Sequence, residues 1–132
     1  MGGNEVKLVD TSSWIEYLRD RESQATGRVR DLVLDGEAAW CDMTLVELWN
    51  GARGAREKRE LAELEKEITL LPVHAPVWKS ACKLARRCRE AGLTVPASDI
   101  VIAACAVNHA VELEYCDEHF IKILPIAAKD SL

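Results

Sequence analysis

The chain has 132 residues, of which 48% are hydrophobic and 30% are charged, and its formal net charge at neutral pH is −5. This length and composition are typical of one globular domain, which we expect over residues 1–132, and they exclude an intrinsically disordered chain. The acidic excess excludes a uniformly basic nucleic-acid-binding protein. No apolar run approaches the roughly 20 residues that cross a bilayer, and no secretory signal is recognisable, so we expect a cytoplasmic protein without a membrane segment.

Strands alternate with helices along the whole chain. The predicted elements are, in order, a strand at 6–9, helices at 11–18 and 25–34, a strand at 38–41, a helix from 45 to Gly51 or Gly54, a charged helix at 56–68, an extended piece at 70–73, helices at 77–90 and 99–107, a strand at 113–115 and a turn at 120–123. This alternation predicts a parallel sheet covered on both faces, which is a three-layer α/β/α fold with a short central sheet.

Four carboxylates occupy equivalent places in this predicted fold. Asp10 and Asp117 each follow a strand. Glu47 lies in the first two turns of a helix after a strand, and Asp99 begins the buried helix. Because ligands of open α/β sheets bind beyond the carboxyl ends of the strands, we expect these side chains to meet there. Each has a simpler explanation when taken singly, since acids also cap helices, favour first helical turns and form turns.

Carboxylates gathered in one place require compensation of their charge. Two of them about 5 Å apart repel each other by roughly 3 kcal/mol at an effective dielectric constant near 20. Such a cluster persists when protons or cations offset the charge. Oxygen ligands without cysteine or histidine partners favour Mg²⁺ or Mn²⁺ over zinc. The four positions therefore predict a metal site that activates a water molecule for hydrolysis.

The cysteines and histidines do not indicate a second kind of site. The five cysteines lack the spacing of zinc ligands, and we expect Cys82, Cys88 and Cys105 to pack as small apolar residues. The three histidines are scattered along the chain, and we interpret them as surface or strand-end residues. His119, two residues after Asp117, is the only one near the predicted metal site.

Three segments carry a family resemblance: LVDTSSWIEYL (8–18), MTLVELWNGA (43–52) and PASDIVIAACAVNHAVELEYCDEHF (96–120). Their order and content resemble PIN domains, and most of all the VapC-type ribonuclease toxins of prokaryotic toxin–antitoxin pairs. The last segment is the most specific, although Tyr115 stands where many relatives have Thr or Ser. The resemblance implies a three-layer α/β/α nuclease that uses Mg²⁺ or Mn²⁺ to cleave RNA.

The resemblance also assigns roles to single residues. Asp10, Glu47 and Asp99 match the three core acids of the family, and Asp117 matches the fourth. Ser12 matches a hydroxyl that supports the first acid or a bound water. All five residues are therefore predicted to belong to the catalytic site, with the four acids as metal ligands.

RNA must reach this acidic site, and two groups of basic residues are candidates for binding its phosphates. Arg53 and Arg56 come soon after the third predicted helix and are the better candidates. Lys79, Lys83 and Arg86 recur along one side of the long helix. The simpler interpretation of each is a solvated surface residue.

The resemblance further implies two partners. A VapB-like antitoxin is expected to bind with its C-terminal segment on the hairpin made by the third and fourth predicted helices, and the family is usually homodimeric. Two other functions remain open from the residues themselves. One is a phosphate-handling α/β protein with Asp10 as the nucleophile, and the other is a PIN-like binding module without catalytic activity.

Overall fold

Four parallel strands form one central sheet in the computed structural model, which describes residues 5–130. They are β1 (Lys7–Val9), β2 (Ala38–Cys41), β3 (Thr69–Leu71) and β4 (Glu112–Glu114). Their order across the sheet is β3-β2-β1-β4, with Leu8 of β1 opposite Ala39 on one side and Leu113 on the other. The chain therefore adds two strands on one side of β1 and then returns to its other side.

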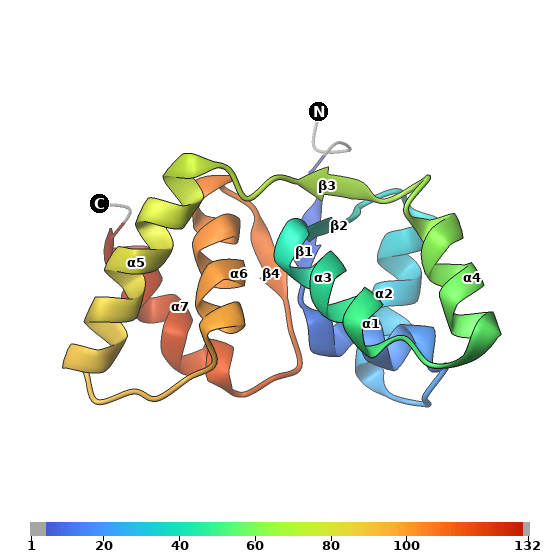
Figure 1. Ribbon diagram of the computed structural model, residues 1–132, viewed down its shortest axis with the longest axis horizontal. Coiled ribbons are helices and arrows are strands. Elements are labelled where there is room, and N and C mark those ends of the chain that lie inside the picture. The colour runs from blue at the N-terminus through green and yellow to red at the C-terminus, as the bar shows by residue number, and fades with distance from the viewer. Residues whose placement is uncertain (1–4, 131–132) are drawn as a thin grey trace.

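Seven helices within the described residues surround this sheet (Figure 1): α1 (Thr11–Leu18), α2 (Gln24–Leu34), α3 (Asp42–Gly51), α4 (Gly54–Leu64), α5 (Ala75–Glu90), α6 (Ala97–Asn108) and α7 (His119–Asp130). α1, α2 and α4 cover one face, and α5, α6 and α7 cover the other. α3 lies at the boundary, because its Met43 packs in one core and its Leu48 in the other. The predicted three-layer α/β/α fold is confirmed. No helix between residues 5 and 130 is long and apolar enough to cross a membrane.

Side chains of the short strands point alternately into two cores. Val9 and Trp40 pack with α1, α2 and α4, where Trp40 stacks at a tilt on Trp14 with ring centroids 5.0 Å apart. Leu8 and Cys41 face α5, α6 and α7. Because both faces of the sheet are buried, the strands are apolar on both sides in their central part, as the sequence of β2 predicts.

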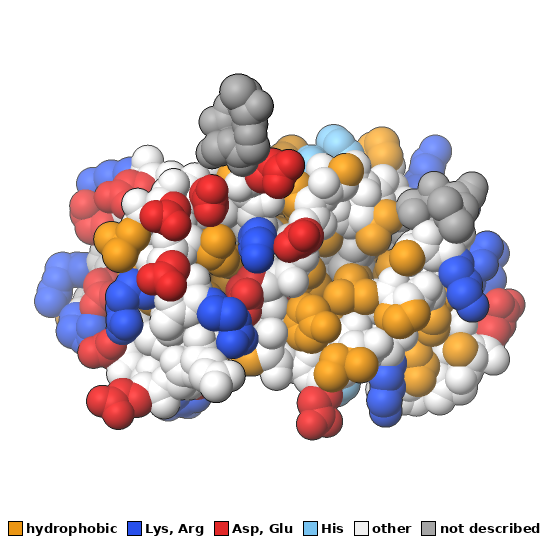
Figure 2. All heavy atoms as spheres, turned by 180° about the vertical axis from the view of Figure 1, so that it is seen from behind, with side chains coloured by type: hydrophobic (Ala, Val, Ile, Leu, Met, Phe, Trp, Pro, Cys, Tyr) orange, Lys and Arg blue, Asp and Glu red, His pale blue; other side chains and the backbone are white. Residues whose placement is uncertain are grey.

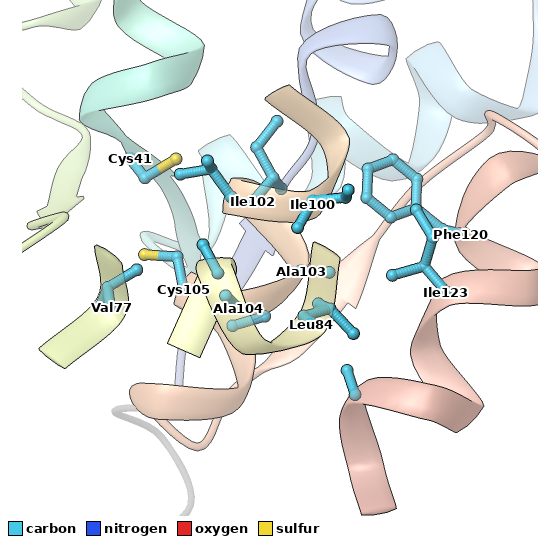
Figure 3. Close-up of a cluster of buried hydrophobic side chains, with 14 of the residues drawn as sticks. Cys41, Val77, Leu84, Ile100, Ile102, Ala103, Ala104, Cys105, Phe120 and Ile123 are labelled. Atoms are coloured by element: carbon cyan, nitrogen blue, oxygen red, sulfur yellow. The ribbon is translucent and has the colours of Figure 1, made fainter. Parts of the chain in front are cut away.

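α6 is the centre of the second core (Figure 3). Every residue from Ile100 to Ala106 is buried, which explains why the sequence is apolar around the whole helix. Its alanines, such as Ala103 and Ala104, allow α5 and α7 to pack closely on either side. Of the cysteines predicted to be packed, Cys88 and Cys105 are buried, but Cys82 is exposed on α5 and that prediction is wrong.

The sequence prediction for β4 needs correction. The strand ends at Glu114 rather than at Tyr115. In the sequence, Leu113 and Tyr115 alternate with glutamates, which predicts a half-buried strand with Glu114 in solvent, but Glu114 is buried. The reason is an ion pair with α2, in which Nε of Arg28 donates to the Glu114 carboxylate at 2.7 Å. A buried carboxylate is retained when such a partner compensates its loss of hydration.

The C-terminal segment is also more regular than predicted. The sequence predicts a short turn that stops before Pro125, but α7 continues through this proline to Asp130. Proline removes one backbone donor and strains a helix interior. Here Phe120, Ile123 and Ala127 recur at helical spacing and are all buried in the second core, and this packing offsets the cost.

The charged fourth helix is shorter than the predicted range 56–68. It begins at Gly54 and ends at Leu64. Its first turn is fixed by Glu57, which is buried. Oε2 of Glu57 accepts the backbone N–H of Arg53 at 2.8 Å, and its Oε1 accepts Nε–H of Arg19, the C-cap of α1, at 3.3 Å. This ion pair connects α4 to α1 across the first core.

Candidate active site

A crevice is expected where the strand order of the sheet reverses, between β1 and β4. After β1 the chain continues into α1 on one face of the sheet, and after β4 it continues into α7 on the other face. A gap is therefore left between the carboxyl ends of the two strands. Asp10 follows β1 directly, and Asp117 comes three residues after β4. The backbone N–H of Asp10 donates to the carbonyl of Glu114 at 3.0 Å, which extends the ladder between the strands up to the site. The start of α6, with Asp99, lies at the same edge (Figure 1).

Asp10 is 1% exposed and is the N-cap of α1. Its Oδ1 accepts the backbone N–H of Ser13 at 2.9 Å, so the capping interpretation is correct. Burial nevertheless raises the pKa of Asp10 from 3.8 to about 6, against the effect of this hydrogen bond, and the charges of Asp99 and Asp117 raise it further. A cap alone does not have this property, since a capping carboxylate is normally stabilised in its charged form. The environment of Asp10 thus disfavours a bare negative charge.

Asp99 and Asp117 converge on one histidine. Nδ1 of His119 lies 2.9 Å from Oδ2 of Asp99 and 2.9 Å from Oδ1 of Asp117. Burial raises the pKa of Asp99, the hydrogen bond from His119 lowers it, and the neighbouring charges of Asp117 and Glu47 raise it. Asp99 is the third residue of α6 and makes no capping hydrogen bond, so the capping interpretation is wrong for this residue.

Glu47 reaches the same site from the middle of α3. Its Oε1 accepts the hydroxyl of Thr11 at 2.7 Å, and Thr11 is also 3.3 Å from the hydroxyl of Thr44. The charge of Glu47 acts on Asp99, which connects it with the other acids. Ser12, the hydroxyl that the family resemblance selects, is half-buried in the first turn of α1, and its role stays a prediction. Asp99 and Asp117 therefore meet at His119, while Asp10 and Glu47 are near enough for charge interactions with this pair, and the role of the four acids as metal ligands stays a prediction.

Sequence reasoning did not assign the contacts of two polar residues of this site. The sequence places His119 near the site, two residues after Asp117, but it does not show that the ring contacts two of the acids. Thr11 directly follows Asp10, and only the path of α3 shows that its hydroxyl meets Glu47.

The two arginines predicted to contact RNA lie at the start of α4. Arg53 is the last residue before this helix, and its side chain is exposed. The guanidinium of Arg56 contacts the carboxylate of Glu60 and donates to the carbonyl of Leu18 at 3.3 Å. Arg56 is therefore already engaged in joining α4 to α1.

The three basic residues predicted on the long helix are all exposed on α5. The end of α5 lies beside the start of α6 (Figure 1). Along α5, Lys79 lies in the early turns, Arg86 in the later turns and Lys83 between them. A contact of these residues with RNA stays a prediction.

The donor set fits a divalent cation. One ligand atom each from Asp99, Asp117 and His119 lies within 4.8 Å of the others, and the three residues are only partly buried, so an ion can reach them from solvent. Asp10 and Glu47 add two carboxylates to the same electrostatic cluster. The raised pKa values of Asp10 and Asp99 indicate that the acids are not compensated by the protein alone.

Comparison with known proteins agrees with this geometry. The family model of the PIN domain matches residues 7–123. The chain belongs to the PIN domain family. Over 117 residues this PIN domain is 32% identical to the VapC ribonuclease Mb1587 of Mycobacterium bovis and to the ribonuclease VapC11 of Mycobacterium tuberculosis. Each match covers 86% of this chain and 87% of the relative.

Solved structures have the same fold. This PIN domain resembles a chain of VapBC2 from Rickettsia felis, bound to a fragment of its promoter DNA, with a TM-score of 0.76 and 15% identity over 92% of this chain and 94% of that chain. It also resembles VapBC-5 of Mycobacterium tuberculosis, of the VapBC family of toxin-antitoxin systems, with a TM-score of 0.67 and 22% identity over 89% and 90% of the two chains.

Proposed function

We propose that this protein is a divalent-metal-dependent endoribonuclease and the toxin of a toxin–antitoxin pair. The observation that supports this best is the pair Asp99 and Asp117 at one histidine of a PIN domain, with the charges of Asp10 and Glu47 interacting with this pair. The relatives at 32% identity are ribonucleases, which agrees with the same chemistry. A nucleophilic role of Asp10 toward a phosphate is less well supported, because Asp10 is 1% exposed and a phosphate would face the other acids.

In the proposed mechanism, Asp10, Glu47, Asp99 and Asp117 hold Mg²⁺ or Mn²⁺. A cation held by these carboxylates would supply a water of lowered pKa and positive charge beside the phosphodiester that is hydrolysed. The chain contributes by fixing its carboxylates before the ion binds. Ser13 orients Asp10 through its backbone N–H, and Thr11 orients Glu47 through its hydroxyl. Fixed ligands reduce the reorganisation that binding and catalysis require.

The test is a cleavage assay with purified protein free of any partner. We expect a mixed RNA pool to be cut in the presence of Mn²⁺ or Mg²⁺ and to stay intact with EDTA. A matched control is Asp31→Asn, which removes an exposed aspartate of α2 and should leave cleavage unchanged. Undiminished cleavage in EDTA contradicts the metal mechanism, and no cleavage with any divalent ion favours the inactive binding module.

Replacing Thr11 by valine tests the orientation of Glu47. Valine keeps the shape of threonine but removes the hydroxyl that donates to Oε1 of Glu47 at 2.7 Å. We expect cleavage at subsaturating Mn²⁺ to fall by about tenfold to a hundredfold, the usual cost of losing a partner of a metal ligand. Titration of the cleavage rate with Mn²⁺ measures the effect. If the cleavage rate of the variant depends on the Mn²⁺ concentration as in the wild type, Glu47 does not need the hydrogen bond from Thr11.

A groove between α1 and α4 supports the proposed VapB-like antitoxin. It has a volume of about 510 Å³ and is lined by Tyr17, Arg56, Arg59, Leu64 and Glu67, among others. Its lining combines apolar side chains with charged ones, which suits an amphipathic segment of a partner. RNA and such a partner act in the cytoplasm, where we therefore place the protein. The first check is whether a small DNA-binding protein is encoded immediately upstream of this gene. The measurement is then neutralisation of RNA cleavage by that protein, and unaltered cleavage contradicts the pairing.

We further propose that the protein is a homodimer. The support is apolar surface on and just before α7. Ile121 of α7 is 61% exposed, and Tyr115 and Leu124 are only partly buried. Figure 2 shows hydrophobic side chains gathered on the right of the face that it presents. Contiguous exposed apolar surface is typical of an interaction site. Light scattering of the purified protein gives the mass in solution, and a monomer at micromolar concentration contradicts this proposal.

A further inference from the structure

His119 is built into the acidic site by its own backbone. It is the first residue of α7, and its N–H donates to Oδ1 of Asp117 at 2.9 Å. The next residue, Phe120, is fully buried in the core and contacts the ring of Tyr115. The imidazole is therefore held between its two carboxylate neighbours by the start of a packed helix. A solvated surface histidine has no such restraint.

We propose that Nδ1 of His119 is a metal ligand, and that this nitrogen makes the site bind Mn²⁺ and other transition-metal ions in preference to Mg²⁺. The inference rests on the proposed metal-dependent function and adds a residue outside the four acids to it. Nδ1 is 2.9 Å from an oxygen of Asp99 and 2.9 Å from an oxygen of Asp117. One ligand atom from each of the three residues lies within 4.8 Å of the others, which is close enough for one ion to contact all three.

The chemistry of the donors gives the expected selectivity. In the tautomer with its proton on Nε2, the lone pair of Nδ1 points into the site. Mg²⁺ prefers oxygen ligands and keeps much of its water, so an imidazole adds little to its affinity. Transition-metal ions gain affinity from nitrogen ligands along the series from Mn²⁺ to Cu²⁺. One histidine among carboxylates therefore separates these ions from Mg²⁺ more than carboxylates alone do.

The same contacts also have a rival explanation. His119 is bonded to two acids and would serve as a hydrogen-bond donor that neutralises them without ever binding metal. His119→Asn separates these roles. An asparagine amide reaches about as far as Nδ1 and retains an N–H donor and a hard oxygen, but it lacks the imidazole nitrogen.

Electron spin-echo measurements on the full-length wild-type chain loaded with Mn²⁺ alone detect a coordinated nitrogen directly. We expect modulation from ¹⁴N that changes to the ¹⁵N pattern when histidine is labelled. The signal should be absent in His119→Asn and kept in His74→Ala. His74 is a matched control, because it is an exposed histidine that stacks on His109 at the start of α5. Bound Mn²⁺ without nitrogen modulation in the wild type overturns the proposal.

Calorimetric titration of the same proteins with Mn²⁺ and with Mg²⁺ gives the selectivity. We expect His119→Asn to weaken Mn²⁺ binding by about tenfold or more, since losing even an outer partner of a metal ligand costs that much. Mg²⁺ affinity should change far less. If His119→Asn has the same ratio of Mn²⁺ to Mg²⁺ dissociation constants as the wild type, the role of His119 as a ligand is overturned. The proposed function still holds in that case, provided that the wild type binds Mn²⁺ and cleaves RNA. A wild-type chain that binds neither ion overturns both.

Discussion

Asp99→Asn is expected to lower RNA cleavage by at least about a hundredfold, the usual cost of removing one group that stabilises charge in a transition state. Asp99 is one of the proposed metal ligands, and the charges of Asp117 and Glu47 act on it. The substitution therefore removes a charged ligand from the middle of the acidic cluster. The fold should persist, because Asp99 caps no helix and asparagine retains an oxygen that accepts the hydrogen bond of His119. Single-turnover cleavage at saturating Mn²⁺ measures the effect.

The melting temperature of Asp99→Asn provides the second readout. An ion that binds only the folded chain stabilises the wild type by about 2.7 kcal/mol at a hundred times its dissociation constant. Most of this metal-dependent rise should disappear in the variant, whereas Asp31→Asn should keep it. Retained cleavage together with a markedly lower melting temperature without metal contradicts our assignment, since Asp99 would then serve the fold.

Asp10→Asn is expected to stabilise the metal-free protein by about 3 kcal/mol at pH 7, because a pKa difference of one unit corresponds to about 1.4 kcal/mol. The pKa of Asp10 is raised from 3.8 to about 6 in the folded chain. Below pH 3.8 the carboxyl group is protonated in both the folded and the unfolded chain, so it does not lower the free energy of unfolding. Between pH 3.8 and 6 the unfolded chain loses the proton first, so stability falls as the pH rises. Above pH 6 the cost is constant.

Denaturant unfolding in EDTA between pH 4 and 8 tests this pH dependence. The wild type should lose stability relative to Asp10→Asn across pH 4 to 6, and the two curves should run parallel above that range. In Asp10→Asn the side-chain oxygen still accepts the N–H of Ser13, so the cap of α1 is kept. In Asp10→Ala this cap is lost, and we expect the free energy of unfolding to be about 1 kcal/mol lower than in Asp10→Asn. A variant that is less stable than the wild type at pH 7 shows that the charge of Asp10 is compensated by the protein.

Local patterns of the sequence determined most of the fold. The four-residue strand Ala38–Cys41 and the helix around Ile100–Ala106 are apolar on all sides, and burial on both faces is the only environment that accommodates such segments. The strand-end position of Asp10 and the placement of Glu47 and Asp99 after strands or at helix starts also follow from the order of elements. Parallel strands bring such positions to one edge, so the acids of the site were predictable.

Tertiary structure decided the contacts between distant residues. His119 meets Asp99 across 20 positions, Thr11 meets Glu47 across 36, and Arg28 meets Glu114 across 86. Periodicity describes which side of an element is buried, but it contains no information on which polar side chains face each other when two elements pack. For this reason Glu114 appears solvated in the sequence although Arg28 compensates its burial, and the sequence places His119 near the site without showing that its ring contacts two of the acids.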